Sequence, residues 1–152
     1  MSRDTDIAYA AGLLDGEGSI VIGLSKRKRL KGIVPDHWLQ VGITGTNREM
    51  LDWLHQNFGG HISDSSHSKS RKKQRPCWTW RVMSNQASEF LKLLLPFLKD
   101  KHQRAILAIE FQETKTQARA TGRVLSQEEI DKRQWYKDEI SRLNLGWRTI
   151  PD

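Results

Sequence analysis

Two kinds of hydrophobic spacing follow one another along the chain and predict its elements. Small and apolar residues at helical spacing predict a first helix that reaches Leu14 and is ended by Gly16 and Gly18. From Ser19 the spacing changes to every second residue, which predicts two strands. The core-facing residues of these strands are Ile20, Ile22 and Leu24 in the first, and Leu39, Val41 and Ile43 in the second.

The same order of elements then recurs. Residues 46–49 have the spacing of a capping box with Thr46 at the N-cap, which predicts a helix ended by Gly59 and Gly60. This doubled helix–strand–strand pattern, with one apolar face per strand, predicts an α+β fold. Its antiparallel four-stranded sheet is covered by helices on one face only. The remaining predicted elements are strands over 61–67 and 78–83, and helices over 84–95, 99–117 and 126–145, the last with a capping box at Ser126.

The opposite face of the predicted sheet is polar. Its side chains are able to hydrogen-bond base edges and phosphates, since Arg suits guanine, Gln suits adenine and Ser adapts to either. A merely solvated face is the alternative, because antiparallel sheets commonly have one. The polar positions are Ser25, Arg27, Arg29, Gln40, Ser63, Ser65, Thr79 and Arg81, and Trp38 is an aromatic member of the same face.

The net charge of +7 is concentrated in the middle of the chain, where residues 23–75 hold eleven basic and four acidic side chains. Such a concentration favours a polyanion-binding surface, although two solvated loops or a localisation signal would look the same. Beside the polar sheet face, it predicts β-hairpins that read the major groove of double-stranded DNA. The basic clusters are Lys26, Arg27, Lys28 and Arg29, and Lys69, Arg71, Lys72, Lys73 and Arg75.

Composition excludes several classes of protein. No apolar run approaches the roughly 20 residues that cross a bilayer, so no membrane partner is expected. The single cysteine, Cys77, cannot form an internal disulfide, and no Cys/His cluster has zinc-ligand spacing. The N-terminus begins with polar and acidic residues, unlike a secretory signal. These features predict an intracellular protein, in either an organelle (chloroplast or mitochondrion) or a prokaryotic cytoplasm.

Residues 10–18, AAGLLDGEG, combine small residues with acidic ones. Ala8, Ala11 and Gly12 allow another helix backbone to approach closely, and the same helix of a second chain is the natural partner across a two-fold axis. Glu17 is expected just past the helix C-terminus, where the dipole disfavours a carboxylate without a cation. The two-fold axis would bring two copies of Glu17 together, and such oxygen ligands suit Mg²⁺.

This segment resembles the LAGLIDADG signature of homing endonucleases, with conservative replacements at the first, fifth and eighth positions and Gly for Ala at the seventh. The resemblance covers about residues 5–118. It implies the LAGLIDADG homing endonuclease fold in one domain over 1–152, with a C-terminal helical extension over 119–152. It also implies that Glu17 is catalytic and ligates metal, with a carbonyl ligand from Gly16. Asp15 is read as structural, holding the helix end.

Two further segments resemble parts of the single-motif members. Residues 96–101 resemble a Pro-Phe-Leu-Lys-x-Lys stretch whose second lysine lies near the scissile phosphate, which implies a catalytic role for Lys101. After the second strand, such members often place a Gln and an Arg in the same pocket. Arg48 matches the basic position, but no Gln is present. The candidates for the position of the Gln are Thr44, Gly45, Thr46 and Asn47.

The resemblance implies a homodimeric, site-specific endonuclease of intron homing that makes a staggered double-strand break in a long pseudo-palindromic DNA target. Mg²⁺ is the expected cofactor, and Mn²⁺ or Ca²⁺ can occupy the same site. The expected partners are double-stranded DNA and a second copy of the chain. Two alternatives use the same fold: an RNA-binding intron maturase, and a catalytically inert DNA-binding module.

Overall fold

The computed structural model describes residues 2–30, 32–65, 75–120 and 124–146. Its element order contains the predicted helix–strand–strand repeat followed by further helices. Within the described residues, no helix combines the length and the apolar character needed to span a bilayer. The elements are α1 (Arg3–Glu17), β1 (Gly18–Arg29), β2 (Gly32–Gly45), α2 (Arg48–Phe58), β3 (His61–Asp64), β4 (Trp78–Met83), α3 (Ser84–Leu94), the 3-10 helix η1 (Leu95–Phe97), α4 (His102–Ala120) and α5 (Gln127–Leu145).

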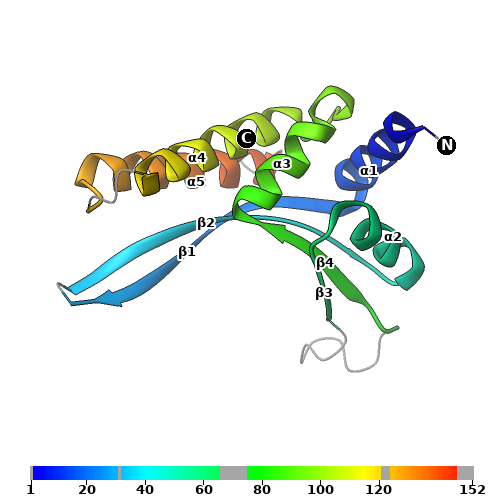
Figure 1. Ribbon diagram of the computed structural model, residues 1–152, viewed down its shortest axis with the longest axis horizontal. Helices are drawn as coiled ribbons and strands as arrows, with labels where there is room; N and C mark the ends of the chain where they lie inside the picture. Colours follow the sequence, from blue (N-terminus) through cyan, green and yellow to red (C-terminus); the bar gives the residue numbers. More distant parts are fainter. Residues whose placement is uncertain (1, 31, 66–74, 121–123, 147–152) are drawn as a thin grey trace, which may run out of the picture.

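The four strands form one antiparallel sheet in the order β1-β2-β4-β3. The sheet arches, and the helices lie together on its convex side, so that the other face is left open (Figure 1). The predicted architecture, a four-stranded antiparallel sheet covered on one face only, is therefore confirmed.

The core lies between the helices and one face of the sheet. Ile20, Leu39 and Val41 are fully buried there, as their alternation predicted. Trp80 of β4 is fully buried at the centre, 5.1 Å from the ring of Phe90, and its indole N–H donates to the carbonyl of Gly59 at 2.8 Å. The indole thus ties the turn after α2 to the core, because its only polar atom finds a backbone partner there.

The C-terminal helix α5 is attached to the rest of the chain by polar contacts. The predicted capping box is present, with Ser126 and Glu129 each accepting from the other's backbone N–H. At the other end of the helix, the amide of Asn144 donates to the carbonyl of Ile20 at 3.0 Å. Burial and the neighbouring Glu110 carboxylate raise the pKa of Tyr136. The helix therefore packs directly against β1 and α4.

Several predicted boundaries were wrong. α2 is capped by Asn47, whose side chain accepts from the N–H of Met50 at 3.3 Å, and not by Thr46. β1 continues through Lys26 to Arg29, so the first basic cluster lies in a strand and not in a solvated loop. β2 pairs with β4 only from Gln40 onward, so the part of the hairpin that precedes Gln40 in β2 is a two-stranded ribbon. Since polar residues occupy both its faces, hydrophobic alternation could not reveal its length.

Candidate nucleic-acid interface and active site

The junction between α1 and β1 places Glu17 at the end of a helix. α1 continues past Leu14, the predicted last residue, and Glu17 is its final, exposed residue instead of lying beyond the helix. Gly18 ends the helix, and its N–H donates to the carbonyl of Leu14. A Cβ on Gly18 would lie 2.5 Å from Leu14 Cδ1 and 2.9 Å from the Leu14 carbonyl oxygen, so the direct passage from helix to strand requires glycine.

Asp15 joins this helix end to the segment before α4. Its carboxylate accepts the backbone N–H groups of Lys99 at 2.8 Å, Asp100 at 3.3 Å and Lys101 at 3.0 Å. Burial favours the protonated carboxyl, but these three donors and the Lys101 ammonium outweigh it, so the pKa of Asp15 is lowered from its ordinary value. Asp15 is therefore a structural link, in the role expected for it.

Lys101 lies at the same helix end as Glu17. Its Nζ donates to the backbone carbonyl of Asp15 at 2.7 Å and lies 3.6 Å from an Asp100 carboxylate oxygen. A cation is favoured here, because the C-terminal carbonyls of α1 carry the negative end of the dipole. The residue is 7% exposed, so its ammonium is held in one place, whereas the sequence suggested only a lysine near a phosphate.

The end of β2 lies beside the same junction. Gly18 pairs with Ile43, so the next residue of β2, Thr44, follows on the side of Glu17. Among the four candidates for the missing Gln, Thr44 is the one on the open sheet face, and its hydroxyl shares a 2.8 Å hydrogen bond with that of Thr79. Of the four candidates, Thr44 is therefore the one whose hydroxyl lies on the open face next to the end of α1.

Arg48 begins α2, three residues after β2 ends. Its Nε donates to Asp52 at 3.0 Å, and its guanidinium lies 5.7 Å from the ring centre of Trp78. Within the described part of the chain, no hydrogen bond or ion pair joins Arg48 to Lys101 or Glu17. The three predicted catalytic residues are thus brought into one region only in part: Glu17 and Lys101 share the α1 end, and Arg48 is held by its own helix.

The open sheet face holds most of the predicted reading residues. Because side chains alternate along a strand, the residues next to the buried positions in β1, β2 and β4 point to this face. Arg81 donates to Ser63 at 3.3 Å, and Ser65 shares a 2.8 Å hydrogen bond with Thr79. These side chains retain further donors and acceptors for a ligand. The predicted residues whose described positions lie on this face are Ser25, Arg27, Trp38, Gln40, Ser63, Ser65, Thr79 and Arg81.

The first basic cluster is divided between the two faces of the hairpin. Lys26 pairs with Pro35 and Lys28 pairs with Ile33, so both lysines alternate to the side that carries Ile22. Arg27 points to the open face, opposite to its two neighbours. Lys26 and Lys28, which were also predicted to bind DNA, therefore lie on the face opposite to Arg27, because strand alternation separates adjacent residues.

Arg75 is exposed and lies in the segment that precedes β4. The other predicted residues of the second cluster, Lys69, Arg71, Lys72 and Lys73, and the side chain of Arg29, lie outside the described residues.

Trp38 lies across the open face of the hairpin. Its cross-strand partner is Gly23, and a Cβ there would come within 2.1 Å of the indole. The indole N–H donates to the hydroxyl of Ser25 at 3.1 Å. The ring is therefore fixed over the glycine, where it presents an apolar surface among polar neighbours.

The outer side of α1 is formed by small residues. Ala8 is partly exposed and Gly12 is exposed, and a Cβ on Gly12 or Gly16 would meet no atom within 4 Å. Ala11, the third predicted interface residue, is fully buried in the core of its own chain, so placing it on an interface was wrong. It follows the side of the helix that carries Ile7 and Leu14, which sequence could not distinguish because α1 has small residues on several sides.

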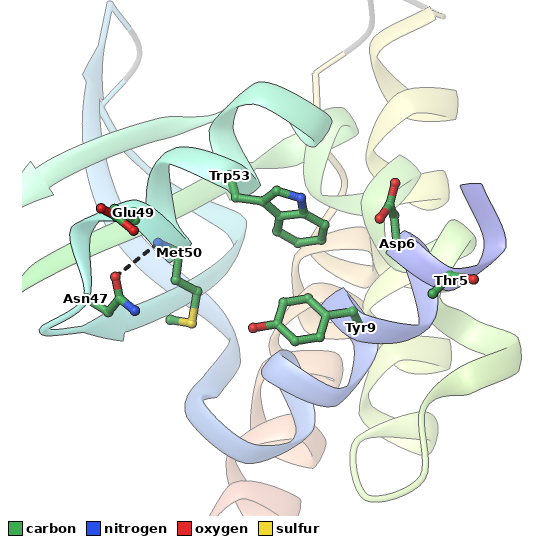
Figure 2. A pocket seen from close by; sticks show the side chains of 7 residues that line it. All are labelled: Thr5, Asp6, Tyr9, Asn47, Glu49, Met50 and Trp53. Atoms are coloured by element: carbon green, nitrogen blue, oxygen red, sulfur yellow. Dashed lines mark hydrogen bonds between the residues drawn. The ribbon is translucent and has the colours of Figure 1, made fainter. Parts of the chain in front are cut away.

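Sequence reasoning missed a hollow between α1 and α2, beside this outer side (Figure 2). Its volume is about 390 Å³, and its wall includes an edge-to-face pair, Tyr9 and Trp53, with ring centres 5.2 Å apart. The lining residues are Thr5, Asp6, Tyr9, Asn47, Glu49, Met50 and Trp53.

Within the described residues, no cluster of three or more His, Cys, Asp or Glu side chains has the geometry to hold a metal ion.

No protein-family model and no curated protein matches the chain in sequence. Solved structures match it in fold. The homing endonuclease I-CvuI, in complex with its target, superposes with a TM-score of 0.74 over 97% of this chain and 87% of its own, at 15% identity. The archaeal intron-encoded homing endonuclease I-Vdi141I, complexed with DNA, gives 0.73 over 99% and 91%, at 16% identity. The homing endonuclease I-TnaI gives 0.65 over 91% and 92%, at 19% identity. The homing endonuclease fold implied by the sequence is therefore confirmed.

Proposed function

We propose that this chain, which has the fold of the homing endonucleases, is a site-specific DNA endonuclease that acts as a homodimer with a divalent cation. The observation that carries the proposal is the position of Glu17. It ends α1, and Gly18 connects it directly to the first strand of a polar, open sheet face. A duplex held on that face would meet the carboxylate at the edge of the sheet.

The open face supports binding to double-stranded DNA. A two-stranded ribbon such as the outer β1–β2 hairpin fits the major groove, whose base edges present donors and acceptors. Arg27, Gln40 and Arg81 supply the matching groups from neighbouring strands. The net charge of +7 adds attraction to the phosphates. If each subunit neutralises about five phosphates, log K falls with log salt with a slope of about −9.

The outer side of α1 supports a two-fold dimer. Ala8, Gly12 and Gly16 recur every four residues, so a second helix backbone can approach closely along this line. Since each chain has one such helix, the partner is a second copy, and the contact is isologous. The axis then brings the two Glu17 residues near each other, between two sheets that each read half of a nearly palindromic site.

The donor groups at the α1 end fit a hard divalent cation. Of its last carbonyls, that of Leu14 accepts from Gly18 and that of Asp15 accepts from Lys101. Gly16 then offers the next carbonyl, beside the Glu17 carboxylate. Mg²⁺ is typically held by one or two carboxylates together with waters and phosphate oxygens, which matches this set. When bound, the cation would act as a Lewis acid on the scissile phosphate and would lower the pKa of an attacking water.

Lys101 has the second chemical role. Its ammonium is fixed by the Asp15 carbonyl, so it does not have to be reorganised when negative charge builds up on the phosphate. The Asp15 carboxylate in turn accepts from the backbone N–H of Lys101, and the two contacts together hold the Lys101 ammonium beside the helix end. This chain therefore supplies one carboxylate and one ammonium to each strand that is cut.

The two alternatives receive no comparable support. A maturase needs a basic surface for RNA away from the sheet, but α5, the main helical addition, carries five acidic and four basic side chains. An inert binding module would need neither the Glu17 carboxylate nor a buried Lys101. The nuclease is therefore the function that this arrangement favours.

The test is Mg²⁺-dependent cleavage of a library of randomised duplex DNA. The expected products are cut in both strands, with a stagger. Glu17→Gln should reduce cleavage about 100-fold or more, while binding to the selected duplex in Ca²⁺ stays within about threefold. Glu139→Gln, which removes a carboxylate of α5 far along the chain, is the matched control and should cut normally. A wild-type protein that binds one duplex specifically but never cuts it would contradict the proposal.

A further inference from the structure

Asp36 of β2 lies at the centre of a charge cluster at the base of the outer hairpin. One carboxylate oxygen is 2.9 Å from Nε of Arg27, across the strand pair. The other is 3.7 Å from Nζ of Lys115, which comes from α4. The Asp36 side chain is 23% exposed and that of Arg27 is 60% exposed. The carboxylate is thus partly buried, while the guanidinium on the same face of the hairpin is exposed.

The helical layer fixes this part of β2. Lys115 donates to the backbone carbonyl of His37 as well as facing Asp36. The buried His37 ring bonds to the side chain of Gln134 on α5 at 2.9 Å. Burial lowers the pKa of Arg133, while the charges of Glu129 and Asp36 oppose this, so Asp36 also lies within electrostatic reach of α5. The carboxylate therefore has a rigid support on its inner side.

Arg27 contacts Asp36 through one nitrogen of its guanidinium. The ion pair uses Nε, and within the described part of the chain no further hydrogen bond or ion pair of Arg27 involves its two terminal nitrogens. Those nitrogens form the planar fork that matches O6 and N7 of guanine. Arg27 borders a hollow of about 290 Å³ at the base of the hairpin, which is also lined by Ser25, Asp36, Trp38, Met83, Ser84 and Lys115.

We propose that Asp36 is a positioning residue that orients Arg27 to read one guanine in each half of the DNA target. The inference deepens the proposed function and rests on it. An isolated exposed ion pair contributes little to stability, because the loss of side-chain conformational entropy offsets most of the electrostatic attraction. Here Lys115 of α4 faces the carboxylate, and α4 and α5 both hold the next residue, His37, so mainly the arginine gives up freedom before it meets DNA. Readout by Arg27 is thereby tied to the C-terminal helix.

The test uses equilibrium binding in Ca²⁺ to a library of randomised duplexes, followed by a base-substitution scan of the duplex that the wild-type protein selects. We expect the wild type to prefer guanine at one position of each half-site by about 10- to 100-fold. Arg27→Lys keeps the charge but not the fork, and should reduce that preference to less than about threefold. Asp36→Ala should do the same at this position and leave the other positions unchanged. Asp36→Ala in the Arg27→Lys background should add no further change there.

Glu139→Gln is the matched control. Its carboxylate pairs with Arg142 at 3.0 Å and is 27% exposed, close to the values for Asp36, but the pair lies on α5. This variant should keep the whole preference profile. If Asp36→Ala folds poorly, Asp36→Asn keeps the shape and should weaken the guanine preference in the same place.

Three results would overturn the inference. In the first, the Asp36→Ala protein keeps the wild-type guanine preference. In the second, the Asp36→Ala protein loses affinity equally for every base at every position. The third is a selected duplex without a guanine that depends on Arg27, which refutes this inference but leaves the nuclease intact. A wild-type protein that selects no sequence at all refutes the proposed function and the inference together.

Discussion

Replacing Asp15 by Asn tests the joint between α1 and the segment before α4. The carboxylate accepts three backbone N–H groups, at 2.8, 3.3 and 3.0 Å, shared between its two oxygens. Asparagine has one acceptor oxygen, and its NH₂ group would face a backbone N–H. At least one bond is lost, and one donor is left without a partner.

The size of the effect follows from the charge on the acceptor. Hydrogen bonds to charged groups contribute about 1.5–3 kcal/mol each, and the partial exposure of Asp15 lets water replace part of the loss. We therefore expect the free energy of unfolding to fall by about 2–3 kcal/mol. For a domain of this length, that lowers Tm by about 5–10 °C.

The contribution of Asp15 to the free energy of unfolding decreases at acid pH. The folded-state pKa of Asp15 is lowered below the ordinary value of 3.8. The contribution of the ionised Asp15 to stability is therefore fully present above about pH 5, and it is lost as the pH falls through the ordinary value toward the lower folded-state value. The stability difference between wild type and Asp15→Asn should be constant from pH 7 to about pH 5 and should narrow below that.

The assay is urea and thermal unfolding across this pH range, with cleavage measured well below Tm. Asp131→Asn, at an exposed position of α5, is the control and should change stability by less than about 0.5 kcal/mol. A difference that widens toward acid would contradict the linkage argument. An Asp15→Asn protein of full stability that no longer cuts would show that this carboxylate takes part in the reaction itself.

Three further predictions concern α1 and the residues at its C-terminal end. Gly18→Ala should destabilise the fold by about 1–3 kcal/mol in urea unfolding, because its Cβ would lie 2.5 Å from Leu14 Cδ1; an unchanged midpoint would contradict this. Lys101→Met should slow cleavage about 100-fold in single-turnover assays and leave binding in Ca²⁺ unchanged, and an equal rate would remove it from the mechanism. Gly12→Leu should keep its Tm but sediment as a monomer, since open space surrounds that position; a persistent dimer would place the interface elsewhere.

Strands with one side facing the core were predicted from the spacing of their apolar residues. Ile20, Leu39 and Val41 alternate because their strands bury one face, and this identified the open face as well. The capping box of α5 was equally visible, because Ser126 and Glu129 lie within one turn and need no distant partner. Local periodicity and local hydrogen bonding therefore account for most of the fold.

Positions fixed by distant contacts left no such signal. The partners of Asp15 are backbone groups 84 to 86 residues away, and the ammonium of Lys101 binds a backbone carbonyl, which no residue type marks. Ala11 is buried although alanine suits either side of a helix. Asp36 is held by Lys115 of α4, and its neighbour His37 is held by Gln134 of α5. The candidate residues could be named from sequence, but their orientation required the packed structure.

The central claim is that Glu17 from two chains holds a divalent cation at the phosphates to be cut. The most direct measurement is a crystal structure of the homodimer on its selected duplex with Mn²⁺, with the metal located by anomalous scattering. We predict manganese within coordination distance of both carboxylates and of a scissile phosphate oxygen. Carboxylates remote from any backbone phosphate, with the manganese absent from between them, would contradict the account.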